Sequence, residues 1–117
     1  MRKITKKGLK RKLDKLCSEI VRSRGICIRC NEKNNLQTAH IFSRTYLNTR
    51  WDIENNVLCL CAKCHFWAHK NPILFTEYIK SLYGEERYAL LKEAHNILYK
   101  PTIENLQIKL DILTKIK

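Results

Sequence analysis

Cysteine and histidine residues at short, regular spacings are the part of this sequence that can do chemistry. The cysteines include two Cys-x-x-Cys pairs, Cys27 with Cys30 and Cys61 with Cys64. Each pair can present two thiolates to one tetrahedral ion, and four thiolates close the coordination sphere as structural zinc sites require. A redox-active Cys-x-x-Cys more often occurs once, near a βαβ pattern that this sequence lacks. The four cysteines therefore predict a structural Zn²⁺ site.

Two further cysteines are predicted to pack in the core. Cys59 lies in an apolar run two residues before Cys61, and Cys17 lies in the apolar stripe of a predicted helix. The two-residue spacer of Cys61 and Cys64 suits a metal knuckle better than a spacer that includes Cys59. Free cysteine behaves as a small buried hydrophobe. We therefore interpret Cys17 and Cys59 as buried thiols.

Three histidines, His40, His65 and His69, can form a second site. His65 and His69 stand four residues apart on a predicted helix, about 6 Å apart on one face, where they can chelate a divalent metal ion. His40 ends a predicted strand beside that helix, where an imidazole can take a proton from water near a metal-bound phosphate. Two alternatives stay open. His69 can instead complement the helix dipole, and His65 can support the zinc ligands.

The charge balance predicts a polyanionic partner. The 117 residues include 23 Lys+Arg against 11 Asp+Glu, a net charge of +12. Nucleic acid is the expected partner, because each neutralised phosphate releases counterions. An anionic membrane surface and a merely basic surface are the alternatives. No apolar run approaches the roughly 18 residues of a membrane span, and the N-terminus lacks the apolar region of a secretory signal. We therefore expect a cytoplasmic protein that does not contact membranes.

One small α+β domain in three segments is predicted. Residues 1–25 form a basic arm and a helix that ends at Gly25. Residues 26–71 form the zinc core, with strands over 36–42 and 57–60 and a helix over 62–70. Residues 72–117 form three helices, over 72–84, over 85–99 and from 102 onward, with Asn71 and Thr102 as N-caps. The positions expected to face the core in these three helices are Leu74, Phe75, Tyr78, Ile79 and Leu82, then Tyr88, Leu91, Ala94, Ile97 and Leu98, and finally Ile103, Leu106, Leu110 and Leu113.

The stripe of the last helix can also pair with another chain, so the oligomeric state stays open. We favour packing within the chain, because the segment is only about four turns long.

The order of these motifs resembles a known family. Cys27-x2-Cys30, Ala39-His40-Ile41, the run from Asn56 to His65, and His69 are similar to the HNH nucleases, which have a ββα-metal fold and a four-cysteine zinc. The resemblance covers about residues 26–71. The segments 39–44 and 50–52 are also similar to phage NinG/Rap-type recombination endonucleases.

The resemblance implies a metal-dependent HNH endonuclease that hydrolyses phosphodiester bonds in DNA. Such an enzyme would act in phage recombination, DNA processing or packaging, in the cytoplasm of a bacterial host. His40 matches the general base. His65 and His69 match ligands of a catalytic Mg²⁺, Mn²⁺, Ni²⁺ or Zn²⁺. Asn56 matches a catalytic-site residue that orients the loop of the base or touches the metal. RNA stays open as a substrate.

One position departs from the family pattern. Many members have Asp or His, a metal ligand, directly before the base histidine, and Ala39 stands there in this sequence. The departure implies either weaker metal binding or a non-catalytic zinc module that binds nucleic acid. NinG-like proteins tend to have a small residue at this position, which favours activity.

Basic side chains near these motifs are the candidate nucleic-acid contacts. Arg44 and Arg50 flank the connection between the strands, where a guanidinium can hold a phosphate, although loop solubility also explains them. Lys10, Arg11 and Lys15 belong to the basic face of the first helix, which predicts contact with the backbone more than with bases. Trp51, between the strands, is expected to anchor the core.

Overall fold

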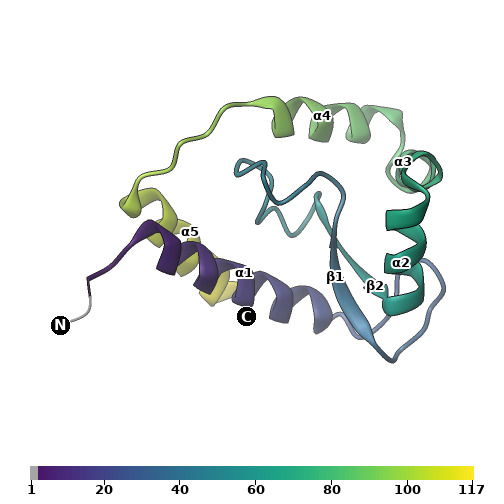
Figure 1. Cartoon of the computed structure of the whole chain (residues 1–117), viewed down its shortest axis with the longest axis horizontal. Coiled ribbons are helices and arrows are strands. Elements are labelled where there is room, and N and C mark those ends of the chain that lie inside the picture. Colours follow the sequence, from purple (N-terminus) through teal and green to yellow (C-terminus); the bar gives the residue numbers. More distant parts are fainter. Residues whose placement is uncertain (1–2) are drawn as a thin grey trace.

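A computed structural model describes residues 3–117; Met1 and Arg2, part of the predicted basic arm, lie outside the described residues. The elements are α1 (Lys6–Arg22), β1 (Leu36–His40), β2 (Val57–Cys61), α2 (Ala62–Lys70), α3 (Pro72–Tyr83), α4 (Glu85–Asn96) and α5 (Ile103–Ile116). Figure 1 shows the β1–β2 hairpin between α1 on one side and α2 on the other. The small α+β fold is thereby confirmed, with five helices and one antiparallel pair of strands in the described chain.

The hairpin divides the core into two clusters. Every residue of β2 is buried, which explains why its sequence is apolar without alternation. Val57 and Cys59 pack on the side of α1, whereas Leu58 and Leu60 pack on the side of α2 and α3. Strand β1 follows the same division, because its register pairs Ala39 with Leu58. The two faces of one short hairpin therefore hold the two halves of the protein together.

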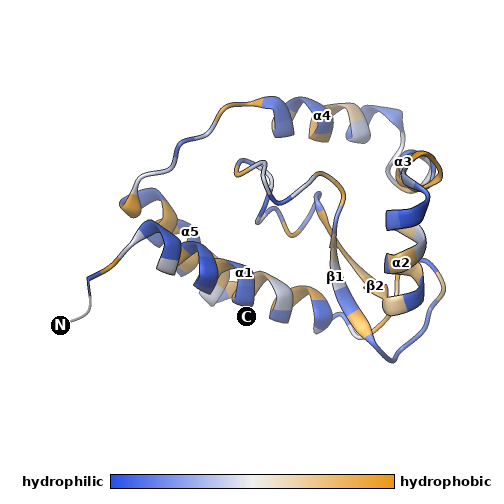
Figure 2. Cartoon of the chain, viewed as in Figure 1, coloured by the Kyte–Doolittle hydropathy of each residue, from blue (hydrophilic) through white to orange (hydrophobic). Residues whose placement is uncertain are grey.

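The cluster on the α1 side joins the two ends of the chain. Leu9 and Leu13 of α1 and Leu106 and Leu113 of α5 are buried in it. In Figure 2, orange and blue segments alternate along both helices, as expected when one face of a helix is buried. Packing of the last helix within the chain is confirmed. Its start is fixed by Thr102, which forms the predicted cap as part of a capping box.

Two predictions about the C-terminal helices were wrong. Helix α4 ends at Asn96, because Ile97 adopts an extended backbone from which the chain runs back to α5. Ile97 and Leu98 are consequently exposed, Leu98 by 83%, although they were predicted to face the core. On α3, Leu74 and Leu82 are exposed for a related reason: only a narrow face of the helix, with Phe75 and Ile79, reaches the hairpin. Ile103 at the start of α5, also predicted to face the core, is exposed as well.

Asn71 occupies the predicted position before α3 but does not cap it with its side chain. Its Nδ2 donates to the carbonyl oxygen of Trp67 at 3.0 Å, and the residue therefore closes α2. Pro72 begins α3, as predicted. Within residues 3–117, no helix is both long enough and apolar enough to cross a membrane.

Candidate functional site

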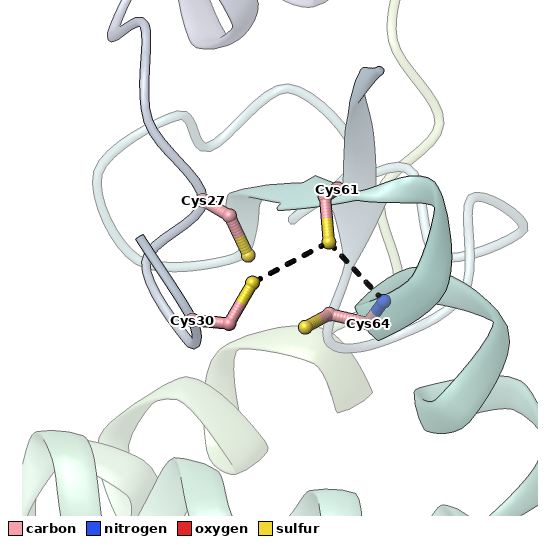
Figure 3. A group of neighbouring side chains, drawn as sticks. All are labelled: Cys27, Cys30, Cys61 and Cys64. Carbon is pink, nitrogen blue, oxygen red and sulfur yellow. Dashed lines mark hydrogen bonds between the residues drawn. The ribbon is translucent and has the colours of Figure 1, made fainter. Parts of the chain in front are cut away.

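Four cysteines form the first part of the site. The Sγ atoms of Cys27, Cys30, Cys61 and Cys64 all lie within 4.8 Å of one another. Figure 3 shows the four side chains converging, with Cys30 Sγ 3.6 Å from Cys61 Sγ. Four thiolates about 2.3 Å from a tetrahedral zinc ion would stand about 3.8 Å apart. The cluster predicted from the spacing is therefore close enough to bind a metal ion such as zinc.

Backbone hydrogen bonds favour the thiolate form of Cys27, whereas burial raises the pKa of the Cys64 thiol to about 12. Cys61 ends β2 and accepts the backbone N–H of Cys64 at 3.5 Å, so its sulfur caps α2. Burial raises the pKa of the Cys27 thiol, but hydrogen bonds from the backbone of Cys61, Cys30 and Arg29 outweigh burial and bring the pKa to about 7. Thiolates are the form that binds metal.

Arg29 adds a positive charge beside the cluster. Its Nη1 donates to Cys64 Sγ at 3.4 Å, and its guanidinium lies 3.6 Å from the centre of the Trp67 ring. Four thiolates around a divalent ion carry a net negative charge, which a guanidinium offsets. Cys17 and Cys59 are buried in the core outside the cluster, as predicted.

The three predicted histidines line one cleft. His40, His65 and His69 surround a hollow of about 550 Å³ that also includes Ser43 and Arg44. The cleft lies beside β1, whose outer edge is unpaired because the sheet has only two strands. Residues from β1, from the following loop and from α2 thus meet at one place.

The imidazoles of His65 and His69 face each other. Their Nε2 atoms are 3.1 Å apart, whereas two imidazole nitrogens on one tetrahedral zinc would be about 3.3 Å apart. Nδ1 of His65 lies 2.7 Å from Oε1 of Gln37, an amide oxygen that only accepts hydrogen bonds. Nδ1 therefore carries the proton, and the lone pair of the ring is on Nε2. This is the usual way in which metal-binding histidines are oriented. Burial, followed by the charges of His69 and His40, lowers the pKa of His65.

His40 is held by the loop that follows β1. Its Nε2 lies 2.8 Å from the carbonyl oxygen of Arg50. A carbonyl oxygen only accepts hydrogen bonds, so Nε2 carries the proton and Nδ1 keeps the lone pair. Burial lowers the pKa of His40, although the bond to Arg50 acts in the opposite direction. The ring is therefore neutral near pH 7, the form that can accept a proton.

Asn56 fixes the same loop. Its side chain is fully buried; it accepts from the Phe42 N–H at 2.8 Å and donates to the carbonyl oxygens of Phe42 and Thr49 at 3.1 and 3.0 Å. These bonds use both N–H groups and one lone pair of the oxygen, and the side chain is fully buried. Of the two roles left open, the geometry therefore favours loop orientation over contact with a metal. His95, to which the sequence assigned no role, stacks on Phe42 with ring centres 3.9 Å apart.

Ala39 contributes no ligand to the cleft. It is buried with Leu58 and Phe75, on the strand face that also bears Gln37. In the described chain the four cysteines are the only group of three or more Cys, His, Asp or Glu side chains close enough to hold a metal. The histidine cleft thus offers a two-imidazole pair.

The two loop arginines differ. Arg50 donates to both oxygens of Asp14, from Nε at 2.9 Å and from Nη2 at 2.5 Å, and only 18% of its side chain is exposed. Arg44 donates one bond to Asp14 and is 58% exposed. Arg50 is therefore committed to the fold, which argues against its predicted phosphate contact, whereas Arg44 is accessible.

The remaining candidate contacts lie on α1. Lys10 and Arg11, together with Lys6 and Lys7, line a basic hollow that reaches Arg44. Lys15 is exposed but lies outside the residues that line this hollow. The basic hollow and the histidine cleft meet at Arg44, which lines both.

Sequence reasoning missed Asp14 and Gln37. Asp14 is the first acidic residue of the chain and stands alone in a basic segment, which could have marked it as a partner for arginine. Gln37 is two residues before Ala39 on β1. Because side chains alternate between the two faces of a strand, this spacing could have predicted that Gln37 faces α2.

Comparison of the chain with protein-family models, with curated proteins and with solved structures gave no match. The assignment of a function therefore depends on the geometry of the two sites.

Proposed function

We propose that the protein is a metal-dependent HNH-type endonuclease that hydrolyses phosphodiester bonds in DNA. The observation that carries the proposal is the cleft that a neutral His40 lines together with the paired imidazoles of His65 and His69. General base and metal ligands are the two components that such a hydrolysis needs. Phage recombination, DNA processing or packaging is the setting that the sequence resemblance suggests.

In the proposed reaction His40 accepts a proton from the attacking water through Nδ1, because its Nε2–H is bound to the Arg50 carbonyl oxygen. His65 and His69 would hold a divalent ion, which when bound would stabilise charge on the phosphate and the leaving oxygen. Arg44 lies in the same cleft and can bind a neighbouring phosphate.

We also propose that the cysteine cluster holds a structural Zn²⁺. Its thiols come from the loop after α1, from the end of β2 and from the first turn of α2, so one ion would cross-link three parts of the chain. This cross-link would keep β1, which carries His40, beside α2, which carries His65.

Incubation of the purified protein with supercoiled plasmid tests the nuclease. We expect nicking with Mg²⁺, Mn²⁺ or Ni²⁺, and a decrease of about 100-fold or more in His40→Ala and His65→Ala. The matched control is His95→Ala, which removes an imidazole outside the cleft. Equal nicking by wild type and His40→Ala, or none with any metal, excludes the nuclease.

A non-catalytic nucleic-acid-binding module is the second candidate. The basic hollow on α1 favours this candidate, because it can bind a phosphate backbone without a catalytic metal. The buried Ala39 favours it too, because it supplies no metal ligand to the histidine cleft. This candidate predicts DNA or RNA binding that weakens steeply with salt, without cleavage and without dependence on His40.

A further inference from the structure

We propose that Asp14 on α1 positions the His40 ring by holding the peptide group that accepts its hydrogen bond. The proposal rests on the proposed function only in giving His40 the role of base. The contacts that carry it are independent of that role.

Asp14 holds this peptide group from both sides. The carbonyl oxygen bound by His40 belongs to the peptide that links Arg50 to Trp51. The Arg50 guanidinium donates to both oxygens of Asp14, and Trp51 Nε1 donates to Oδ1 at 2.9 Å. Because the side chains of both residues that flank the peptide bind one carboxylate, these bonds oppose rotation of the carbonyl away from His40.

The carboxylate is well suited to this task. It is partly buried, with 24% of its side chain exposed, and it accepts hydrogen bonds from three residues of one loop. Burial acts to raise the pKa of Asp14, but its bonds to Arg50 and Trp51 and the nearby guanidinium charges lower the pKa overall. Asp14 is therefore charged at neutral pH, and charge-assisted bonds are the stronger ones.

The fixed carbonyl determines which nitrogen of His40 is available. With Nε2–H bound, the lone pair stays on Nδ1. Without that bond, both tautomers are accessible and the ring can rotate. A displacement of about 1 Å in a reacting group can lower a rate about 100-fold without changing affinity for substrate.

The arrangement also connects the basic helix to the base. Asp14 belongs to α1, the helix whose lysines line the basic hollow, and it reaches across to the loop between the strands. One acidic residue on the expected DNA-binding helix would thus hold the reactive ring in place.

The test is Asp14→Asn, which keeps the size of the side chain and removes its charge. Two-bond ¹H–¹⁵N NMR of the ring should show His40 as the Nε2–H tautomer in the wild type and as a mixture in the variant. The rate constant kcat for plasmid nicking should fall about 10- to 100-fold. The Kd for DNA should not rise, because Asp14 lines the basic hollow and its replacement removes a negative charge from that surface. The control is Asp111→Asn, an equal change of charge at an exposed position on α5.

Two further variants separate positioning from general stability. Arg50→Lys keeps the charge but loses the bidentate contact with Asp14, so this variant should also show the mixture of His40 tautomers and the low kcat. Trp51→Phe removes the indole N–H while keeping an aromatic ring in the core, and should give a smaller change in the same direction. Asp14→Glu, which restores the carboxylate, should recover part of both readouts.

A single Nε2–H tautomer in zinc-loaded, folded Asp14→Asn and Arg50→Lys overturns the proposal. If Asp14→Asn fails to fold, the same result in Trp51→Phe and Arg50→Lys overturns it. If the wild type does not nick DNA, the nuclease is excluded, and the NMR comparison still decides whether Asp14 positions His40.

Discussion

The cysteine cluster and the histidine cleft use the same helix, α2, in opposite ways. The cluster takes Cys61 and Cys64 at the start of the helix and completes a set of four ligands, three of them buried. The cleft takes His65 and His69 from the next turns, and these two imidazoles are its candidate ligands. A complete set makes a bound metal part of the fold, whereas an incomplete set leaves coordination positions for water and substrate.

The two regions also differ in what holds their side chains. Each pair of cysteines is held by the backbone of its own segment, a turn at Cys27 and Cys30 and the start of α2 at Cys61 and Cys64. The cleft depends on side chains from distant segments: Asp14, Gln37 and Asn56. Changes to the cluster should therefore cost both bound zinc and stability, whereas changes to the cleft and to its supporting side chains should leave zinc bound.

The largest effect is expected from Cys61→Ser. Binding of structural zinc contributes on the order of 10 kcal/mol in zinc-finger peptides, which is comparable to the whole stability of a small domain. We expect loss of bound zinc and of cooperative thermal unfolding, measured by metal analysis and circular dichroism. Cys59→Ala is the control, with zinc retained and a loss of about 1 kcal/mol. Zinc loss in the control alone would reverse the ligand assignment.

Asn56→Ala should have the next largest effect. It removes three hydrogen bonds of a fully buried amide and leaves backbone groups of the loop unpaired, at about 1–3 kcal/mol for each such group. We expect a loss of about 3 kcal/mol in the free energy of unfolding in urea, with zinc retained. Asn55→Ala, a partly exposed neighbour, should cost less than about 1 kcal/mol. Equal losses would show that the loop does not depend on Asn56.

Arg44→Ala should act on binding alone. Arg44 is accessible and lines both the cleft and the basic hollow, so its loss should remove about one phosphate contact. We expect roughly three- to tenfold weaker DNA binding and a salt dependence lower by about one unit in slope. Stability should change by less than about 1 kcal/mol, because its pair with Asp14 is largely exposed. Lys92→Ala on α4 is the control. An equal loss of DNA affinity in this variant would indicate that binding depends on overall charge and not on a defined site.

The smallest effect is expected outside both regions, at Leu98. Its side chain is almost fully exposed, so Leu98→Ser should change the free energy of unfolding by no more than about 0.5 kcal/mol. Leu91→Ala, a buried position of α4, should cost about 2–5 kcal/mol in the same urea titration. A large effect at Leu98 would mean that its side chain is covered in solution.

Local patterns in the sequence predicted local structure well. The spacing of the cysteines identified the cluster, and residues 62–70 form a helix with the predicted bounds. The cap at Thr102 was likewise read from adjacent residues. The helix bounds and the cap depend on contacts between residues a few positions apart. The cluster joins two pairs that are distant in the sequence, but the shared requirement for four thiolates around one ion links them.

Contacts across the fold could not be predicted in the same way. Nothing near Asp14 in the sequence indicates that it meets Arg50 and Trp51, because the hairpin alone brings them together. The exposure of Ile97 and Leu98 has the same origin: an apolar side chain at helical spacing is buried only if another element covers it, and none of the described elements buries them.

The packing of α1 against α5 has a consequence for the order in which the protein can form. Helix α1 is synthesised well before α5, the helix that packs against its apolar face. All four cysteines are synthesised by residue 64, so the hairpin and α2 can be cross-linked by a metal while the chain is still growing. Closing the contact between Leu9 and Leu106 spans nearly the whole sequence and is entropically late. Until α5 has been synthesised, the apolar face of α1 can pack only against the hairpin and its connecting loop.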